Sequence, residues 1–178
     1  MSRFLFMVAG LCLCMLSQAA AAEPINIGAL LPMTGSVAAF GQMAWDGINT
    51  ARHIEPEVLG RPIEIRLADT KSEKVDSANA VSRLIEREKV VAIIGELISG
   101  NTIAASDHAE RSKISMVSPT ATNPLVNQGK KFVFRVCFTD PEQGRVAAKF
   151  ALNQLHAKTV AVIYDISQDY CVGLKTFF

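Results

Sequence analysis

The chain has almost no net charge and few of the residues that bind metals or form disulfides. Its 178 residues include 18 basic and 17 acidic side chains, three histidines and four cysteines. The missing basic excess argues against a protein that binds nucleic acid through phosphate contacts. Four cysteines are too few for a disulfide scaffold, and an apolar content of 49% argues against a disordered chain. The composition is that of an ordered protein with a hydrophobic core.

Common catalytic and cofactor-binding motifs are also missing. His53, His108 and His156 are far apart, and none stands at a metal-ligand spacing from a cysteine. The sequence contains no G-x-G-x-x-G, no G-x-x-x-x-G-K-[ST] and no G-x-S-x-G motif. We therefore expect no enzymatic activity, no metal site and no cofactor.

The amino-terminal end has the pattern of a secretory signal peptide. Arg3 supplies a positive charge, residues 4–16 form an apolar run, and small residues up to Ala22 precede Glu23. The apolar run is shorter than the roughly 20 residues that span a bilayer. The pattern therefore predicts a signal peptide over residues 1–22, cleaved between Ala22 and Glu23, and an exported, soluble protein. Cleavage would remove Arg3 and leave equal numbers of basic and acidic residues.

Segments typical of strands and helices alternate along the rest of the chain. Strands are predicted at 25–31, 61–67, 90–94, 114–117, 132–138 and 159–164. Helices are predicted from about residue 41, from 72, over 102–111 and from 140, with a further helix at the end. The helix from 140 is expected to bury Val146, Ala147, Phe150 and Ala151. Alternation with short links predicts an α/β fold, with a parallel sheet and helices on both faces.

Two polar loops after buried strands form the candidate ligand site. Residues 95–102 lead from a strand into a helix, where free N–H groups attract anions and the Ser99 hydroxyl adds a donor. N-capping of that helix by Ser99 is the alternative. Residues 118–124 follow the next strand, at the edge where open α/β sheets bind ligands, and an ordinary loop is the alternative there.

These loops belong to a longer series of segments that resembles one protein family. The series comprises 27–35, Phe40-Gly41, Gly47, 93–95 with Ser99 and Thr102, 118–124, Phe134-Arg135, Asp140 with Gln143-Gly144, and Tyr164-Asp165 with Tyr170 and Gly173-Leu174. In this order it resembles the periplasmic solute-binding proteins of branched-chain amino acid ABC transporters, the leucine/isoleucine/valine-binding protein family. The resemblance implies a periplasmic binding protein-like I fold of two Rossmann-like lobes that close on an amino acid. It further implies a periplasmic monomer whose partner is the membrane part of the transporter.

The resemblance also implies a set of ligand contacts. Ser99 and Thr122 would hold the ligand α-carboxylate, and the backbone around Thr120 and Ala121 would take the ammonium group. Further contacts would come from Leu97 and Ile98 beside the ligand, from Phe40 as an aromatic wall, and from Tyr170 in the second lobe.

The signal pattern and the resemblance together divide the chain into three parts. A signal peptide occupies 1–22, a first lobe 23–140, and the start of a truncated second lobe 141–178. A sensory module for an amide or urea-type ligand, and a non-functional truncated product, remain alternatives. Cys137 and Cys171 either pair in the exported protein or stay as thiols, because the sequence does not supply the geometry.

Overall fold

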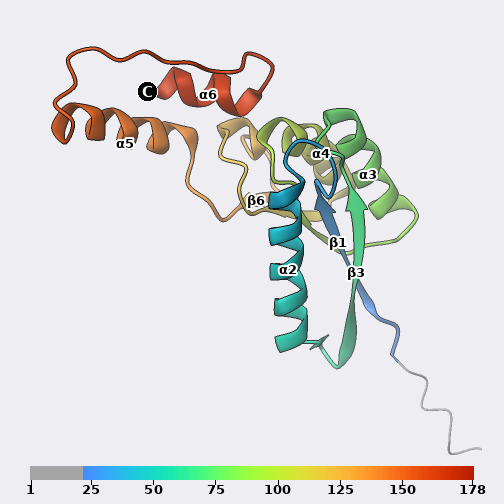
Figure 1. The fold of residues 1–178 in the computed structure, drawn as a ribbon. Helices are drawn as coiled ribbons and strands as arrows, with labels where there is room; N and C mark the ends of the chain where they lie inside the picture. Colours follow the sequence, from blue (N-terminus) through green and yellow to red (C-terminus); the bar gives the residue numbers. More distant parts are fainter. Residues whose placement is uncertain (1–21) are drawn as a thin grey trace, which may run out of the picture.

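The computed structural model describes residues 22–178, which form a sheet flanked by helices and two further helices beside it (Figure 1). The predicted signal peptide lies, apart from Ala22, outside the described residues, so its cleavage stays a prediction. The strands are β1 (Ile25–Leu31), β2 (Glu57–Val58), β3 (Arg61–Asp69), β4 (Ala92–Gly95), β5 (Ser115–Ser118) and β6 (Val133–Arg135). The helices are α2 (Ala38–Ile54), α3 (Lys74–Glu86), α4 (Ser99–Ser112), the short η1 (Pro124–Val126), α5 (Asp140–Asn153) and α6 (Asp169–Phe177).

The sheet has six strands in the order β2-β3-β1-β4-β5-β6. All neighbours pair in parallel except β2, which is antiparallel to β3. The chain places β3 on one side of β1 and β4 on the other, which makes β1 and β4 the switch point of the topology. Open α/β sheets bind ligands outside the carboxyl ends of the strands at such a point. The predicted fold class, an α/β parallel sheet with helices on both faces, is confirmed.

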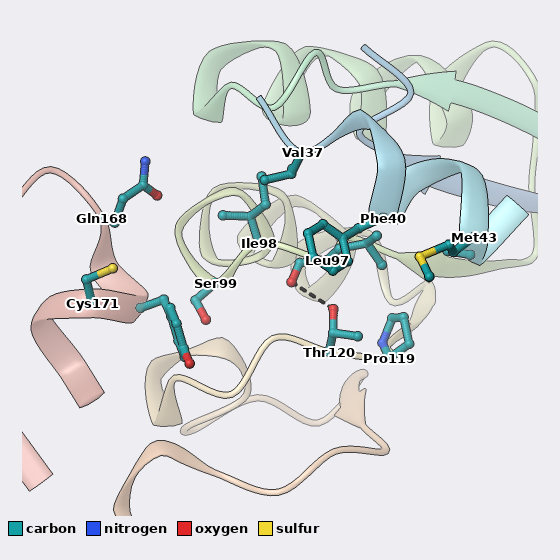
Figure 2. Close-up of a pocket in the computed structure, with 12 residues that line it drawn as sticks. Val37, Phe40, Met43, Leu97, Ile98, Ser99, Pro119, Thr120, Gln168 and Cys171 are labelled. Carbon is teal, nitrogen blue, oxygen red and sulfur yellow. Dashed lines mark hydrogen bonds between the residues drawn. The ribbon is translucent and has the colours of Figure 1, made fainter. Parts of the chain in front are cut away.

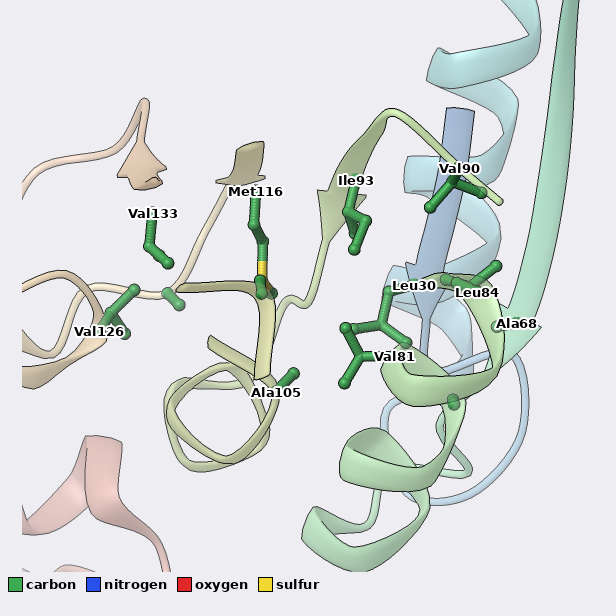
Figure 3. Packing of buried hydrophobic residues seen from close by; sticks show 13 residues of the cluster. Leu30, Ala68, Val81, Leu84, Val90, Ile93, Ala105, Met116, Val126 and Val133 are labelled. Carbon is green, nitrogen blue, oxygen red and sulfur yellow. The ribbon is translucent and has the colours of Figure 1, made fainter. Parts of the chain in front are cut away.

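Helices cover the two faces of the sheet unequally. The larger buried cluster lies between the sheet and helices α3 and α4, and joins Leu30, Val81, Leu84, Ile93 and Met116 (Figure 3). A smaller cluster under α2 contains Ala29, Leu31 and Ile48. The clusters share β1 and β4 and therefore fix the strand ends from which the candidate ligand loops start. Among the described helices, none has the length and apolar character needed to cross a bilayer.

The predictions for the last third of the chain are wrong in three places. Residues 159–164 form no strand: they are extended and exposed, because no strand of the described chain pairs with them. The predicted strand at 132–138 shortens to Val133–Arg135. The face of α5 predicted to be buried is largely exposed, with Val146 at 51% and Phe150 at 55%. Helix α5 instead turns Gly144 toward α6, where it meets Phe177.

Candidate functional site

A cavity of about 630 Å³ lies at the carboxyl edge of the sheet, lined by residues that follow three neighbouring strands and by the start of α6. Figure 2 shows the side chains converging on it from these separate segments. The lining residues are Val37, Phe40, Met43 and Ala44 after β1, Leu97, Ile98 and Ser99 after β4, Pro119 and Thr120 after β5, and Gln168, Tyr170 and Cys171 at α6. The cavity is therefore built at the switch point of the sheet.

The cavity brings together six of the eight residues predicted as ligand contacts. These six are Phe40, Leu97, Ile98, Ser99, Thr120 and Tyr170. The other two, Ala121 and Thr122, are buried behind the lining residues and take no part in the wall. Ala121 donates its N–H to the Ser118 hydroxyl at 3.2 Å. A ligand role for Ala121 and Thr122 stays a prediction.

The loop after β4 carries Ser99 into the first turn of α4. Ile98 is the N-cap residue and no side chain caps the helix, so the alternative of N-capping by Ser99 is wrong. The Ser99 hydroxyl instead accepts a hydrogen bond from the Asn123 N–H at 3.3 Å. The first helical bond runs from the Thr102 N–H to the Ile98 carbonyl at 2.8 Å, so the preceding amides lack intrahelical acceptors. This end of α4 suits an anionic group.

The side of the cavity formed by α2 is apolar. Phe40 and Met43 are 62% and 68% exposed, and both line the cavity with Leu97 and Pro119 (Figure 2). Thr120 donates to the Leu97 carbonyl at 2.9 Å and so joins the loops after β4 and β5. Apolar walls with a few polar groups are typical of small-molecule sites.

Six of the twelve residues that line the cavity were not predicted as ligand contacts. Pro119 lies within the candidate loop 118–124, whereas both candidate loops exclude Val37, Met43, Ala44, Gln168 and Cys171. The position of the first three was signalled by the sequence, because they follow β1, and the switch point of a doubly wound sheet includes the loop after that strand. Gln168 and Cys171 gave no such signal, because only the packing of α6 beside α4 brings them near.

Helix α6 is attached to α3 and to the loop after β5 by polar contacts around Asp169. The Lys74 ammonium of α3 lies 2.7 Å from the Asp169 carboxylate, and the Asn123 side-chain amide donates to the Asp169 carbonyl at 3.1 Å. The Gln143 amide donates to the Tyr170 hydroxyl at 2.9 Å and links α5 to the same turn. These bonds hold the turn that carries Tyr170 at the edge of the cavity.

Two carboxyl groups near the site have perturbed acidity. Burial raises the pKa of Glu96, although hydrogen bonds to its oxygens lower it in part. Burial also raises the pKa of Asp140, and the nearby Thr122 hydroxyl and Arg135 charge offset this only in part. Both Asp140 carboxyl oxygens and the Thr122 hydroxyl are buried without a hydrogen-bond partner among residues 22–178. The same residues contain no group of three metal-ligating side chains, and both Cys137 and Cys171 are free thiols.

Comparison with known proteins places this architecture in a family. Residues 24–174 match the family described as periplasmic binding protein. The leucine-specific-binding protein of Salmonella typhimurium is 33% identical over 175 residues, which cover 94% of this chain and 46% of that protein. An amino acid binding protein of Pseudomonas aeruginosa is 34% identical over 145 residues, which cover 79% and 39%. The chain thus spans less than half the length of these relatives.

Solved structures of leucine- and isoleucine-binding proteins superpose on this chain. The crystal structure of leucine binding protein LivK from Thermotoga maritima shares 52% identity and superposes with a TM-score of 0.85, covering 86% of this chain and 44% of that one. LivJ from Streptococcus pneumoniae, solved with isoleucine, shares 31% identity at a TM-score of 0.77, covering 87% and 45%. The chain belongs to the periplasmic binding protein family, a family of solute-binding proteins rather than enzymes, as a homologue of the Leu/Ile/Val-binding proteins.

Proposed function

We propose that this protein captures a branched-chain or related small amino acid outside the cytoplasm, for import by an ABC transporter. The observation that supports this best is the cavity itself, where the amino-terminal turn of α4 and the Ser99 hydroxyl face an apolar wall that includes Phe40 and Met43. An amino acid with an aliphatic side chain has matching chemistry, with an anionic carboxylate at one end and an apolar group at the other. Similarity to proteins described as leucine-binding supports the same ligand class.

The proposed binding pose follows from the polarity of the wall. The ligand α-carboxylate takes the hydroxyl of Ser99 and the free amides of the first α4 turn, where the helix dipole also favours negative charge. The aliphatic side chain lies against Phe40, Met43 and Leu97. The ammonium group lies toward the loop at Thr120, near backbone carbonyls. No acidic residue belongs to the cavity wall formed by residues 22–178, so the ammonium depends on neutral acceptors there.

Capture would involve the closure of two lobes. In this proposal residues 23–140 form the first lobe and residues 141–178 begin the second, with the connection before Asp140 as a hinge. The presence of both Ser99 and Tyr170 in the cavity wall supports this division, because the ligand would contact both parts of the chain. The closed form would then be recognised by the membrane subunits of the transporter. The protein would act as a periplasmic monomer after cleavage between Ala22 and Glu23.

Calorimetry on the full protein tests the proposal with leucine, isoleucine and valine, and with 4-hydroxybenzoate and urea as ligands of other classes. A solute-binding protein from R. palustris, whose crystal structure contains 4-hydroxybenzoate, shares 28% identity with this chain. This acid is therefore the most informative alternative ligand to test. Aliphatic amino acids are expected to bind and the other two to fail. Binding of 4-hydroxybenzoate or urea alone would overturn the proposal in favour of an aromatic-acid carrier or a sensory module.

Two substitutions test the carboxylate contacts. Ser99→Ala is expected to weaken leucine binding by about 1–3 kcal/mol, because the ligand carboxylate would lose a donor. Thr122→Ala tests the predicted contact of the buried Thr122 hydroxyl, and the same loss is expected if the closed form brings that hydroxyl to the carboxylate. Ser36→Ala is the matched control, since Ser36 is exposed in the loop before α2 and makes no side-chain hydrogen bond among the described residues. Unchanged affinity in Ser99→Ala would refute its role. An effect confined to Ser99→Ala would leave Thr122 as a buried structural residue.

A further inference from the structure

Glu96 is a buried carboxyl group directly behind the candidate ligand loop. Its side chain is 0% exposed and takes no part in the cavity wall. One oxygen accepts from the Ile98 N–H at 2.5 Å. The other accepts from the Thr70 hydroxyl at 2.8 Å and from the Asn101 side-chain amide at 3.4 Å. All three partners donate, so the hydrogen bonds match the ionised form of the carboxyl group.

The backbone carbonyl of Glu96 extends this network to the next strand. It accepts from the Ser118 hydroxyl at 2.6 Å and from the Thr102 hydroxyl at 3.1 Å. Ser118 in turn accepts from the Ala121 N–H. One residue therefore joins the carboxyl ends of β3, β4 and β5 to the first turn of α4. Fully satisfied buried networks of this kind hold their members in one arrangement.

We propose that Glu96 is a positioning residue, whose ionised carboxylate holds the loop of residues 97–99 in the shape that presents Ser99 and the α4 amides to the ligand. The inference rests on the proposed function for the identity of the ligand. Neither the sequence motifs nor the similarity to relatives assigns a role to this residue. Its partner Ile98 is both the N-cap residue of α4 and part of the cavity wall, so the carboxylate acts on the site through a single peptide unit.

In the part of the chain that the structure describes, the groups around Glu96 leave its negative charge without a cationic partner, so the hydrogen-bond network depends on its protonation state. The groups bonded to the carboxyl, from Thr70, Ile98 and Asn101, are neutral, and two charged side chains of β3 and α3 are engaged elsewhere. Asp69 accepts from Met33, Thr34 and Lys71, and Lys74 of α3 pairs with Asp169. Burial raises the pKa of Glu96, which brings its protonation closer to neutral pH.

Protonation would weaken the network. A proton on either oxygen removes the charge, and at least one of the three donated bonds must break or reverse. The Ile98 bond then changes from a charge-assisted bond to a weaker neutral one. Ligand affinity is therefore expected to fall as the pH decreases through the raised pKa. A competing effect has the opposite sign, because an ionised Glu96 repels a ligand carboxylate at the same helix end.

Glu96→Gln separates these effects, because glutamine has nearly the same shape and cannot ionise. The full chain is examined without ligand by NMR, following the Ile98 amide signal with pH, and with leucine by calorimetry over the same range. The Ile98 signal should titrate in the wild type and stay constant in Glu96→Gln. Leucine affinity should fall with decreasing pH in the wild type, and at neutral pH should be about fivefold to tenfold weaker in the variant, without pH dependence. Glu73→Gln, an exposed glutamate before α3, is the control expected to behave as wild type.

Several results would overturn the inference. Tighter binding in Glu96→Gln would show that charge repulsion outweighs positioning, and equal pH profiles in the variant and wild type would show that Glu96 is a passive part of the core. If Glu96→Gln does not fold, an Ile98 signal that fails to titrate in the wild type still overturns the proposal. A wild type that binds no leucine at any pH refutes the proposed function, while the Ile98 titration still decides the role of Glu96.

Discussion

Two glycines of α2 offer a test of how tightly the wall of the cavity is fixed. Gly41 is buried where the helix passes the end of β1: a Cβ there would contact the Pro32 carbonyl and lie 2.7 Å from its carbon. Gly47 lies six residues further along the same helix, and a Cβ there would meet nothing within 4 Å. Alanine at Gly41 must therefore displace backbone, whereas alanine at Gly47 enters open space.

The expected effects have opposite signs. Replacing a helical glycine by alanine stabilises a protein by about 0.5–1 kcal/mol when the site tolerates it, which is the expectation for Gly47→Ala. At Gly41 the same gain competes with a steric cost of about 1–3 kcal/mol for overpacking against backbone. Gly41→Ala is therefore expected to destabilise by about 0.5–2 kcal/mol. Displacement of the start of α2, which carries Val37 and Phe40 into the cavity wall, should also weaken ligand binding.

Urea unfolding followed by circular dichroism measures both variants under the same conditions. Equal slopes for the variants and wild type would show that the midpoints report stability rather than a change in the unfolded state. Shifts of the midpoint in the same direction and by the same amount would refute the reasoning, because they would show that the close approach of α2 to Pro32 does not constrain residue 41.

Three further predictions concern the carboxyl-terminal helices and the thiols. Burial raises the pKa of Asp140 above its usual 3.8, so the folded protein binds this proton more tightly than the unfolded chain and loses stability as the pH rises through and above that value. Asp140→Asn should thus be more stable than wild type near neutral pH by about 1 kcal/mol and equal to it in acid, and lower stability at neutral pH would contradict this. A Cβ at Gly100 would lie 2.6 Å from the Lys74 Cε and contact Asp169, so Gly100→Ala should speed hydrogen exchange in α6, and unchanged exchange would show that the ion pair moves aside freely. Burial raises the pKa of the Cys137 thiol, so it should react with iodoacetamide more slowly than a peptide thiol at about pH 8, and an equal rate would refute this.

The sequence predicted the first part of the fold well because each element carries its own pattern. The β-branched run at 90–94 and the alternating run at 61–67 mark strands that lie inside the sheet, and both occur close to their predicted positions as β4 and β3. The run at 159–164 has equally strong strand character but forms none, because a strand also needs a neighbour with free backbone groups. The residue pattern of a single segment does not show whether a neighbouring strand is present to pair with it.

The same distinction explains which parts of the site were predictable. Ser99 and Thr120 follow strands in sequence, so the topology of a parallel sheet brings them to one edge. Glu96 also follows a strand, but its role depends on Thr70 and Asn101, whose side chains meet it only after β3 and α4 have packed. A single buried acidic residue produces no periodic pattern and no motif, so Glu96 was predicted only as part of a loop.

The contacts on the two sides of the cavity differ in strength, and this difference locates the motion that capture would need. On the sheet side, Glu96 and Ser118 are fully buried and bonded across strand ends, where hydrogen bonds are strongest and costly to break. On the α6 side, the Lys74–Asp169 pair is about half exposed, at 50% and 43%, and such pairs contribute only about 0.2–1 kcal/mol. Opening of the cavity would therefore break the contacts of Asp169 before it disturbs the loop that carries Ser99. In the proposed closure, the sheet side would be the fixed half of the site, and the unit of α5 and α6 would be the half that moves.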